Sequence, residues 1–323
     1  MNEYDVVVIG GGAAGLSAAL VLSRARRRVA VVDAGEPRNA PAAHMHGFLG
    51  WDGAPPATLL MQGRDEVASY GGVLIAGTVT DLRLAPDDHV PADADAEAVP
   101  RFEVTLADGQ QLTARRVLVT TGLRDEIPDI QGARERWGRD LLHCPYCHGY
   151  EVRDQPVGVL GGTPEAVAHA LLIRQWAGDV VFFTHTSELT DLEREQLLAR
   201  AIGVVEGPVA RLVVDGDRLA GVQLDTGQVV PRTAVFVRPQ FVANSDLLVR
   251  LGCATHDNGW VVVDTVGATS VPGVWAAGNA ANPRAQVVTA AGEGSAAAIA
   301  INNHLADEDT AQAVTDYHRG LPS

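Results

Sequence analysis

Two glycine-rich segments, each between a strand-like apolar run and a helix-like run, constrain the fold of this chain more than any other feature. The first occupies residues 10–15 (GGGAAG) and follows the apolar run Tyr4–Ile9. A run of small residues continues to about Arg24, and a second apolar run, Val29–Val32, ends at Asp33. Strand, glycine turn, helix and second strand with a terminal acid form the βαβ pattern of dinucleotide-binding domains. The sequence therefore predicts a Rossmann-like unit at the N-terminus.

Each prominent residue of this first turn has a physical task in the βαβ pattern. We expect Gly10 to make the tight turn, Gly12 to admit a pyrophosphate close to the backbone, and Gly15 to let the helix approach the strand. Asp33 is expected to accept hydrogen bonds from ribose hydroxyls. A glycine turn alone is a weak signal, but its position between strand and helix makes this one specific.

A second unit of the same kind lies in the middle of the chain. Residues 156–164 (PVGVLGGTP) lead into an alanine-rich helix to about Trp176 and then into a predicted strand, Val180–Phe183. The pattern is degraded here, because Thr163 stands at the third turn position and Pro164 is expected to begin the helix. The repeat nevertheless predicts a second nucleotide-type domain.

The residues that follow the predicted strand Val180–Phe183 argue against binding of NADPH. A 2′-phosphate is normally held by Arg or Lys, but the segment 184–191 (THTSELTD) offers one histidine, His185, and the acids Glu188 and Asp191. A domain that has lost its nucleotide and is kept for its packing is equally compatible with the sequence. Whether the second unit binds NAD(P)H is therefore left open.

The C-terminal part returns to the pattern of the first unit. Trp260–Asp264 is predicted as a strand, and Gly273–Asn279 as a strand that ends in a polar turn. A helix of small residues is predicted from about Gln286 to Leu305. The N-terminus of that helix could direct backbone amides and the positive end of its dipole at a cofactor.

These signals predict an α/β fold with two Rossmann-like domains, doubly wound and three-layered, the second inserted into the first. The predicted boundaries are 1–122 with 244–323 for the first domain and 123–243 for the second. A β-meander is expected within Gly77–Leu106, interrupted by the acidic, proline-containing stretch 86–100, which we predict to be a solvated loop.

Charge and composition exclude several partners. The chain has 25 Lys and Arg against 40 Asp and Glu, and its net charge of −15 would repel the phosphates of a nucleic acid. No run approaches the roughly 18 apolar residues of a transmembrane helix, and the N-terminus enters a strand with no signal-peptide pattern. We therefore expect no nucleic-acid or membrane partner, and a cytoplasmic location.

Two of the three cysteines form a Cys-x-x-Cys pair, Cys144 and Cys147. Three cysteines are too few for a disulfide framework in 323 residues, and a close pair in a reducing compartment is more often redox-active or metal-binding. Two sulfurs at this spacing can close a disulfide that thiolate attack reopens, so the pair can store two electrons. Cys253 stands alone and is expected to be an inert core residue.

Two metal-binding interpretations of the same segment compete with redox chemistry. The sequence Cys144–His148 matches the Cys-x-x-Cys-His pattern of covalent haem attachment, but such haem is normally attached outside the cytoplasm. His143 and His148 could join the cysteines in a zinc site, but structural zinc sites normally draw ligands from two separated pairs. We therefore expect no metal here.

Taken in order, these motifs resemble the low-molecular-weight thioredoxin reductase family over nearly the whole chain. The shared signatures are Gly10-x-Gly12-x-x-Gly15, Thr120-Thr121-Gly122, the Cys144/Cys147 pair, and Val274–Asn279 leading to Gln286. The resemblance implies a homodimer whose FAD domain is made from both chain ends, with a pyridine-nucleotide-type domain between them. It also implies that Cys147 is the cysteine nearer the flavin. Besides the glycine turn, the implied FAD site comprises Ala14, Asp33, Val79, Gly122, Asn279, Gln286 and Val287.

Three departures from the thioredoxin reductases resemble a subgroup of that family. Asn279 stands where those reductases usually carry an aspartate that holds a ribitol hydroxyl. His148 directly follows Cys147, where they usually place an acid that handles the thiol proton, and histidine can do this near neutral pH. The basic cluster after Phe183 is missing. These features and the segment Asp33–Asn39 resemble the dithiol oxidases of natural-product biosynthesis, similar to the gliotoxin and holomycin disulfide-forming enzymes.

The sequence supports three functional hypotheses. In the favoured one, a dithiol oxidase, Cys144, Cys147 and His148 are catalytic, and electrons pass from a substrate dithiol through FAD to O2, giving hydrogen peroxide. In the second, NADPH reduces FAD and a thioredoxin-like disulfide is reduced. The third is a non-enzymatic flavin-containing redox sensor. The substrate class stays open between a small molecule, a peptide and a thioredoxin-like protein, and no role is assigned to His44, His46 and His143.

Overall fold

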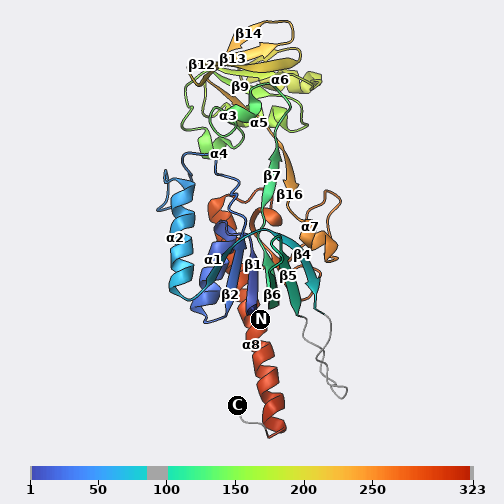
Figure 1. Ribbon diagram of the computed structural model, residues 1–323. Coiled ribbons are helices and arrows are strands. Elements are labelled where there is room, and N and C mark those ends of the chain that lie inside the picture. Colours follow the sequence, from blue (N-terminus) through green and yellow to red (C-terminus); the bar gives the residue numbers. More distant parts are fainter. Residues whose placement is uncertain (1, 86–100, 321–323) are drawn as a thin grey trace. The chain divides into compact units, whose positions relative to one another are not determined.

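The computed structural model describes residues 2–85 and 101–320, and the chain divides into two compact units (Figure 1). Unit 1 comprises Met1–Arg38, Ala57–Arg124 and Val242–Ser323, and unit 2 comprises Asn39–Pro56 and Asp125–Phe241. The predicted α/β fold with two Rossmann-like domains is confirmed. One segment differs from the expected division, because 39–56 groups with unit 2. The loop predicted at 86–100 lies outside the described residues.

Unit 1 is built on a seven-stranded mixed sheet with the strand order β3-β2-β1-β6-β5-β4, in which β17 also pairs with β6. Its strands are β1 (Asn2–Ile9), β2 (Val29–Asp33), β3 (Val73–Ala76), β4 (Val79–Leu84), β5 (Phe102–Leu106), β6 (Gln111–Val119) and β17 (Val274–Ala276). Neighbours among β3, β2, β1, β6 and β17 pair in parallel, whereas β4, β5 and β6 pair antiparallel. The run Val6–Ile9 is buried on both faces, as expected for a central parallel strand.

Helices α1 (Ala13–Arg24) and α8 (Val287–His318) lie side by side in unit 1 and share one core with β1 and β2 (Figure 1). Their contact is closest where Gly294 meets Ala14: a Cβ on Gly294 would lie 2.0 Å from the Ala14 carbonyl oxygen. No side chain fits there, so glycine is required for the two helices to approach this closely. Unit 1 also contains the helices α2 (Pro56–Ser69) and α7 (Asp246–Arg250).

Helix α8 continues to His318, whereas the sequence pattern predicted its end near Leu305. Just beyond Leu305 the helix is held by ion pairs rather than by an apolar face: Asp309 pairs with Arg27 and Arg115 at 2.6 Å each, and Glu308 pairs with Arg116 at 2.8 Å. Apolar periodicity therefore could not mark the end of this helix.

The strand predicted at Trp260–Asp264 is wrong, since this segment makes only an isolated bridge between Val261 and Thr255. Asp264, the last residue of this segment, begins a turn. Its Oδ1 accepts hydrogen bonds from the backbone N–H groups of Val266 and Ala268, at 2.9 and 2.8 Å, and so forms a local turn.

Unit 2 is built on a five-stranded parallel sheet with the order β11-β10-β9-β15-β8, and it carries a separate antiparallel sheet, β12-β13-β14. The strands are β8 (Leu141–Leu142), β9 (Val157–Leu160), β10 (Val180–Phe183), β11 (Ile202–Val205), β12 (Val209–Asp215), β13 (Arg218–Leu224), β14 (Val229–Pro231) and β15 (Ala234–Phe236). The helices are α3 (Ala133–Arg136), α4 (Pro145–His148), α5 (Ala166–Ile173) and α6 (Asp191–Ala199). Strands β7 (Leu123–Glu126) and β16 (Gln240–Ala243) pair with each other where the chain passes between the units.

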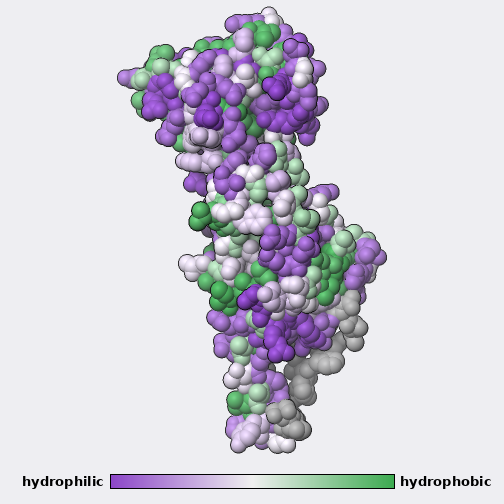
Figure 2. Space-filling model, turned by 90° about the vertical axis from the view of Figure 1, so that its left-hand side faces the viewer, coloured by the Kyte–Doolittle hydropathy of each residue, from purple (hydrophilic) through white to green (hydrophobic). Residues whose placement is uncertain are grey.

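Polar and apolar side chains are interspersed over the face seen in Figure 2. Within residues 2–85 and 101–320, no helix is long and apolar enough to cross a membrane.

The Gly294 contact predicts opposite effects for two substitutions in the same helix. Gly294→Ala should destabilise the protein by about 1–3 kcal/mol or more, because the added methyl meets backbone rather than a flexible side chain. Gly292→Ala is the matched control, since a Cβ there meets nothing within 4 Å, and it should stabilise α8 by up to about 1 kcal/mol. Urea denaturation of both variants measures the difference, and equal effects would contradict this account of the packing.

His169 on α5 predicts a loss of stability in acid. It is 4% exposed and packs edge-on against Phe236, and burial lowers its pKa from 6.5 to about 4. The unfolded chain therefore binds a proton here at higher pH than the folded chain, so stability falls as the pH drops below about 6.5. From pH 7 to pH 5 the contribution is about 2 kcal/mol. His169→Phe should flatten the pH dependence of the unfolding free energy, and the same change at the exposed His256 should not.

Candidate active site

The glycine turn after β1 is shaped by close backbone contacts in unit 1. Gly10 has φ +109°, and a Cβ on it would lie 2.4 Å from the Thr120 carbonyl oxygen. A Cβ on Gly15 would lie 1.9 Å from the Gly10 carbonyl oxygen. The Thr120 hydroxyl completes the turn by donating to the Gly10 carbonyl at 2.8 Å. These contacts match the tasks that the sequence predicted for Gly10 and Gly15.

Gly12 differs from its neighbours because the space beside it is open. A Cβ on Gly12 would meet nothing within 4 Å. Gly12 is also the N-cap of α1, which has no side-chain cap and no acidic residue in its first turn. The first N–H groups of α1 therefore have no side-chain cap and lie beside open space. This arrangement suits a phosphate group. The turn fits the cofactor that the resemblance implies.

Asp33 ends β2, as predicted, but its carboxylate has partners within the protein. Oδ2 accepts from Arg64 at 2.9 Å, and Oδ1 accepts from the Gly35 N–H at 3.3 Å. Arg64 lies on α2 and was not predicted as a site residue, because nothing in the local sequence relates it to β2. It holds the carboxylate in place beside the glycine turn.

Asn279 lies in the short 3-10 helix Gly278–Ala280 after β17. Its Nδ2 donates to the carbonyl oxygens of Asn282 and Ala285, at 2.9 and 3.0 Å, and its Oδ1 accepts from Arg38 at 3.4 Å. Both amide protons are therefore used to hold the loop that leads into α8. An aspartate could not donate these bonds, which gives a structural reason for asparagine here.

Glu293 on α8 fixes the same loop and was missed at the sequence level. Its carboxylate accepts from the Gly278 N–H at 2.9 Å and from the Asn282 side-chain amide at 2.6 Å. The only signal in the sequence was an acid within a run of small helical residues. Glu293 thereby positions Asn279 and the start of α8.

The remaining predicted FAD residues fall into two groups. Gln286 is the N-cap of α8 and makes no side-chain cap, so the N–H groups that begin with Val287 are uncapped. Ala14 packs beside Gly278, close to this loop. Gly122 has φ +71°, and its carbonyl accepts from the Asn244 N–H at 3.0 Å. Val79 begins β4 and packs against the same core cluster as Ala281, which follows the 3-10 helix of Asn279.

The second glycine turn, in unit 2, is closed by the protein's own groups. The Gly162 N–H donates to the Ser187 hydroxyl at 2.6 Å. Glu165 is the N-cap of α5, which begins at Ala166 rather than at Pro164 as predicted. An acid at this helix start opposes binding of an anion. His185 accepts from the Val209 N–H through Nδ1 at 3.0 Å, and burial lowers its pKa, which favours the neutral ring over a cation for a phosphate.

Cys144 and Cys147 are joined by a disulfide at the start of the short helix α4. The Cys144 Sγ accepts a hydrogen bond from the Cys147 N–H at 3.2 Å, and Pro145 occupies the first helical position. Tyr146, between the cysteines, is 63% exposed. Among the residues that the structure describes, no group of three or more His, Cys, Asp or Glu side chains could hold a metal ion.

His148 ends α4 and is half-buried. Burial lowers its pKa, and the nearby charge of Glu151 opposes this effect. His148 is therefore suited to be neutral near pH 7 and to accept a proton beside the cysteines. Its Nδ1 is buried without a hydrogen-bond partner among the described residues.

The other singled-out residues have ordinary contacts. His143 stacks on Trp137, with ring centroids 6.4 Å apart, and meets Phe241 edge-on at 5.2 Å. His44 Nδ1 lies 3.0 Å from the Gly53 carbonyl oxygen. Cys253 is buried, as expected, and burial raises the pKa of its thiol, which keeps it unreactive.

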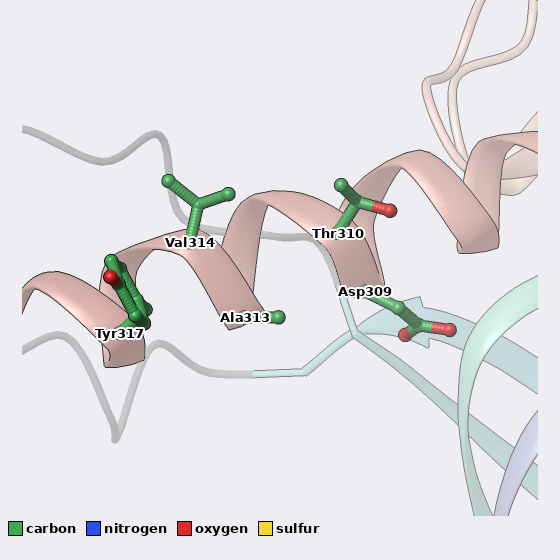
Figure 3. A pocket seen from close by; sticks show the side chains of 5 residues that line it. All are labelled: Asp309, Thr310, Ala313, Val314 and Tyr317. Carbon is green, nitrogen blue, oxygen red and sulfur yellow. The ribbon is translucent and has the colours of Figure 1, made fainter. Parts of the chain in front are cut away.

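A surface hollow along the last turns of α8 contains none of the predicted site residues. It is lined by Asp309, Thr310, Ala313, Val314 and Tyr317, which lie along one side of the helix (Figure 3). We assign it no part in the chemistry.

Comparison with known proteins agrees with this geometry. Residues 4–294 match the family model described as pyridine nucleotide-disulphide oxidoreductase. The chain is 32% identical to thioredoxin reductase sirT of Leptosphaeria maculans, over 95% of this chain and 96% of that protein. The crystal structure of HlmI superposes with a TM-score of 0.93 at 57% identity, covering 98% of this chain and 96% of that one. An oxidoreductase from Agrobacterium tumefaciens superposes with a TM-score of 0.85 at 35% identity, covering 94% and 99%.

These matches span nearly the whole chain and confirm the resemblance drawn from the motifs. They also account for the open turn after β1, which fits FAD, and for the disulfide in α4. The chain belongs to the pyridine nucleotide-disulphide oxidoreductase family and is an FAD-dependent disulfide oxidoreductase of the thioredoxin reductase-like type.

Proposed function

We propose that this protein is a dithiol oxidase, which forms a disulfide in a small molecule or peptide and delivers the electrons through FAD to O2. The observation that carries the proposal is the contrast between the two glycine turns. The turn at Gly12 is open and uncapped, whereas the turn at Gly162 is bonded to Ser187 and followed by Glu165. An NADPH-dependent reductase needs the second turn for its nucleotide, and an oxidase does not.

The NADPH-dependent thioredoxin reductase remains the second candidate, because relatives such as sirT carry that name. It would require Ser187 and Glu165 to move away from the position of a pyrophosphate. It would also require a cation for the 2′-phosphate, and neither Glu188 nor neutral His185 supplies one. These requirements favour the oxidase.

In the proposed reaction, electrons enter at the disulfide. A substrate thiolate attacks the Cys144 sulfur, so a substrate–Cys144 bond forms while the Cys144–Cys147 bond breaks and Cys147 leaves as a thiolate. The second substrate thiolate then attacks the substrate sulfur of this mixed disulfide. The product disulfide forms, Cys144 leaves as a thiolate, and the enzyme has gained two electrons.

The local structure supports Cys144 as the leaving group of the second step. The Cys147 N–H donates to the Cys144 Sγ at 3.2 Å. This bond strengthens when the sulfur becomes negative, and a stabilised thiolate leaves faster. FAD, when bound, accepts the electron pair of the enzyme dithiol and transfers it to O2, which with two protons gives hydrogen peroxide.

His148 is proposed as the base that accepts a substrate thiol proton. Because burial lowers its pKa, it is suited to be unprotonated near neutral pH and ready to accept. The FAD-binding role is likewise proposed for the residues around the first turn and the C-terminal loop. They are Gly10, Gly12, Ala14, Gly15, Asp33, Val79, Gly122, Asn279, Gln286 and Val287.

Three predictions from the sequence accompany this proposal without a test in the structure. They are the homodimer, the cytoplasmic location and the absence of nucleic-acid and membrane partners. Sedimentation velocity of the purified holoprotein would decide the first.

Anaerobic reduction of the flavin tests the proposed function. We expect dithiothreitol to bleach the yellow holoprotein rapidly, and NADPH and NADH to leave it yellow. Cys144→Ser and Cys147→Ser should each lose about 10³-fold or more in bleaching rate, because each removes a sulfur of the exchanging pair. Cys253→Ser, a buried thiol outside the pair, is the matched control and should bleach normally. Admission of air should restore the colour, with consumption of oxygen and formation of peroxide.

Each contrary outcome has a defined meaning. Rapid bleaching by NADPH would replace the oxidase by the reductase. A flavin that stays oxidised with all three compounds would favour a redox sensor with a structural cysteine pair.

The hydrogen bonds of Asn279 predict that an aspartate is not tolerated there. Asn279→Asp removes two donors and sets a carboxylate against the carbonyls of Asn282 and Ala285, which should destabilise the loop by about 2 kcal/mol or more. We expect a lower Tm and loss of FAD on dialysis, followed by flavin absorbance. Asn258→Asp is the matched control, because Asn258 only accepts a bond, from the Trp260 N–H, and a carboxylate can keep it. Full FAD retention by Asn279→Asp would contradict the role of this loop.

A further inference from the structure

Tyr146, the residue between Pro145 and Cys147, is an exposed aromatic side chain beside the disulfide, and the mechanism above does not use it. It is 63% exposed. A single exposed apolar side chain is common at a protein surface and needs no functional reason. The position and the contacts of this ring therefore decide whether it takes part in binding.

Trp176 supports the ring of Tyr146. The two rings meet edge to face, with centroids 5.6 Å apart and an interplanar angle of 89°. Trp176 follows α5 and is half-buried. Its carbonyl accepts from the Asp154 N–H at 3.0 Å, and its N–H donates to the Ile173 carbonyl at 2.9 Å. Tyr146 is therefore an exposed ring that packs on an anchored one.

The same indole packs against the backbone at the end of α4. A Cβ on Gly149 would lie 2.9 Å from both Cγ and Cδ2 of Trp176, and 2.5 Å from the Pro145 carbonyl oxygen. No side chain fits between the indole and this backbone. Trp176 thus contacts the chain before Cys147, at Tyr146, and after it, at Gly149.

A loop from the segment 39–56 anchors the chain that follows α4. His46 Nε2 lies 3.4 Å from Glu151 Oε1. The loop that carries His46 is closed by its neighbour Met45, which is 5% exposed and whose N–H donates to the Ala54 carbonyl at 2.9 Å. The backbone that presents Tyr146 is therefore held by contacts from two other parts of unit 2.

Tyr150 provides a comparison within the same segment. It is 64% exposed, so its exposure matches that of Tyr146. The guanidinium carbon of Arg153 lies 4.0 Å from the centroid of the Tyr150 ring, and Arg153 Nη1 donates to the Tyr150 carbonyl at 2.7 Å. One face of the Tyr150 ring is therefore already covered by a cation of the protein.

We propose that Tyr146 is a specificity-determining residue of the thiol-exchange site, and that its ring, supported by Trp176, binds an apolar ring carried by the dithiol substrate. This inference rests on the proposed function, because it names the class of dithiol that attacks Cys144. The Cα atoms of Cys144 and Cys147 lie 5.2 Å apart, and Tyr146 directly precedes Cys147. Substrate atoms close to a sulfur bonded to Cys144 therefore come within reach of the Tyr146 side chain.

A planar apolar ring is the group that this surface favours. Aromatic rings attract one another in offset-stacked and edge-to-face arrangements, beyond the gain from buried area alone. The contact with Trp176 also reduces the side-chain freedom that Tyr146 would lose on binding. A ring beside the two thiols benefits from both effects, whereas dithiothreitol, which is acyclic and carries hydroxyl groups, benefits from neither.

Selectivity between two dithiols tests this proposal in the intact holoprotein. The protein is mixed anaerobically with ortho-benzenedimethanethiol or with dithiothreitol. Entry of electrons is followed through flavin absorbance and, after rapid quenching, through the freed cysteines, which are counted by alkylation and mass spectrometry. In each exchange two substrate thiols become a disulfide while the Cys144–Cys147 disulfide becomes two thiols.

The measured quantity is the ratio of the two rate constants, aromatic dithiol over dithiothreitol. Tyr146→Ala should lower this ratio by about twofold to tenfold, and Tyr146→Phe, which keeps the ring, should preserve it. Tyr150→Ala is the matched control and should leave the ratio at the wild-type value. Trp176→Leu should also lower the ratio, and the double variant Tyr146→Ala/Trp176→Leu should lower it no further than Tyr146→Ala alone.

The contrary outcomes are distinct. A ratio that stays unchanged in Tyr146→Ala would overturn the proposal, even if both dithiols react more slowly, because the ring would then only maintain the reactivity of the disulfide. An equal fall in Tyr150→Ala would overturn it as well. Cysteines that open while the flavin stays oxidised would overturn the proposed oxidase instead, and the ratio measured from the freed cysteines would still decide the role of Tyr146.

Discussion

The close approach of backbone to backbone around the first glycine turn is the constraint on which unit 1 depends. Gly15 lets α1 approach the Gly10 carbonyl, and Gly294 lets α8 approach the Ala14 carbonyl. Side chains at these positions would push both helices away from the carboxyl edge of the sheet. Because the helices stay close, the uncapped N-termini of α1 and α8 belong to one compact unit with the Asn279 loop. The proposed cofactor site thus combines glycines in close backbone contact with two helix N-termini that have no side-chain cap.

The two βαβ units share one pattern, but their glycine turns differ. The turn at Gly12 in unit 1 has open space beside it, whereas the turn at Gly162 in unit 2 is hydrogen-bonded to Ser187. The turn sequences differ, since Thr163 in unit 2 stands where unit 1 has Gly12, and the residues after the second strand of each unit differ as well. In unit 1 that strand ends at Asp33, whose carboxylate is held by Arg64. In unit 2 the strand leads to Ser187, whose hydroxyl accepts a hydrogen bond from the Gly162 N–H. A hydrogen bond from a neighbouring loop is therefore one difference between the two turns.

Local sequence patterns predicted the helices and strands of this protein well. They did not predict the features that depend on contacts between residues distant in sequence. The first βαβ unit, β10 and the position of β17 were predictable from apolar runs bounded by glycine or acid, which act over a few residues. The strand predicted at Trp260–Asp264 is not formed, and this segment ends in a turn at Asp264. Helix α8 continues beyond its apolar face, where Asp309 pairs with arginines that are distant in sequence. The interaction partners of the site residues were the hardest to predict from the sequence. Glu293 and Arg64 meet their partners through the fold, and no periodicity marks them.

The division of the chain has a practical consequence for anyone who would study unit 2 in isolation. Its residues come from two stretches, 39–56 and 125–241. A fragment cut to the continuous stretch would contain both cysteines, His148 and Glu151, yet it would lack the loop closed by Met45 and the imidazole that faces Glu151. Such a fragment could retain a normal disulfide and still titrate differently from the intact protein. Chemical properties measured on it would describe an incomplete environment, so the natural experimental unit is the whole chain.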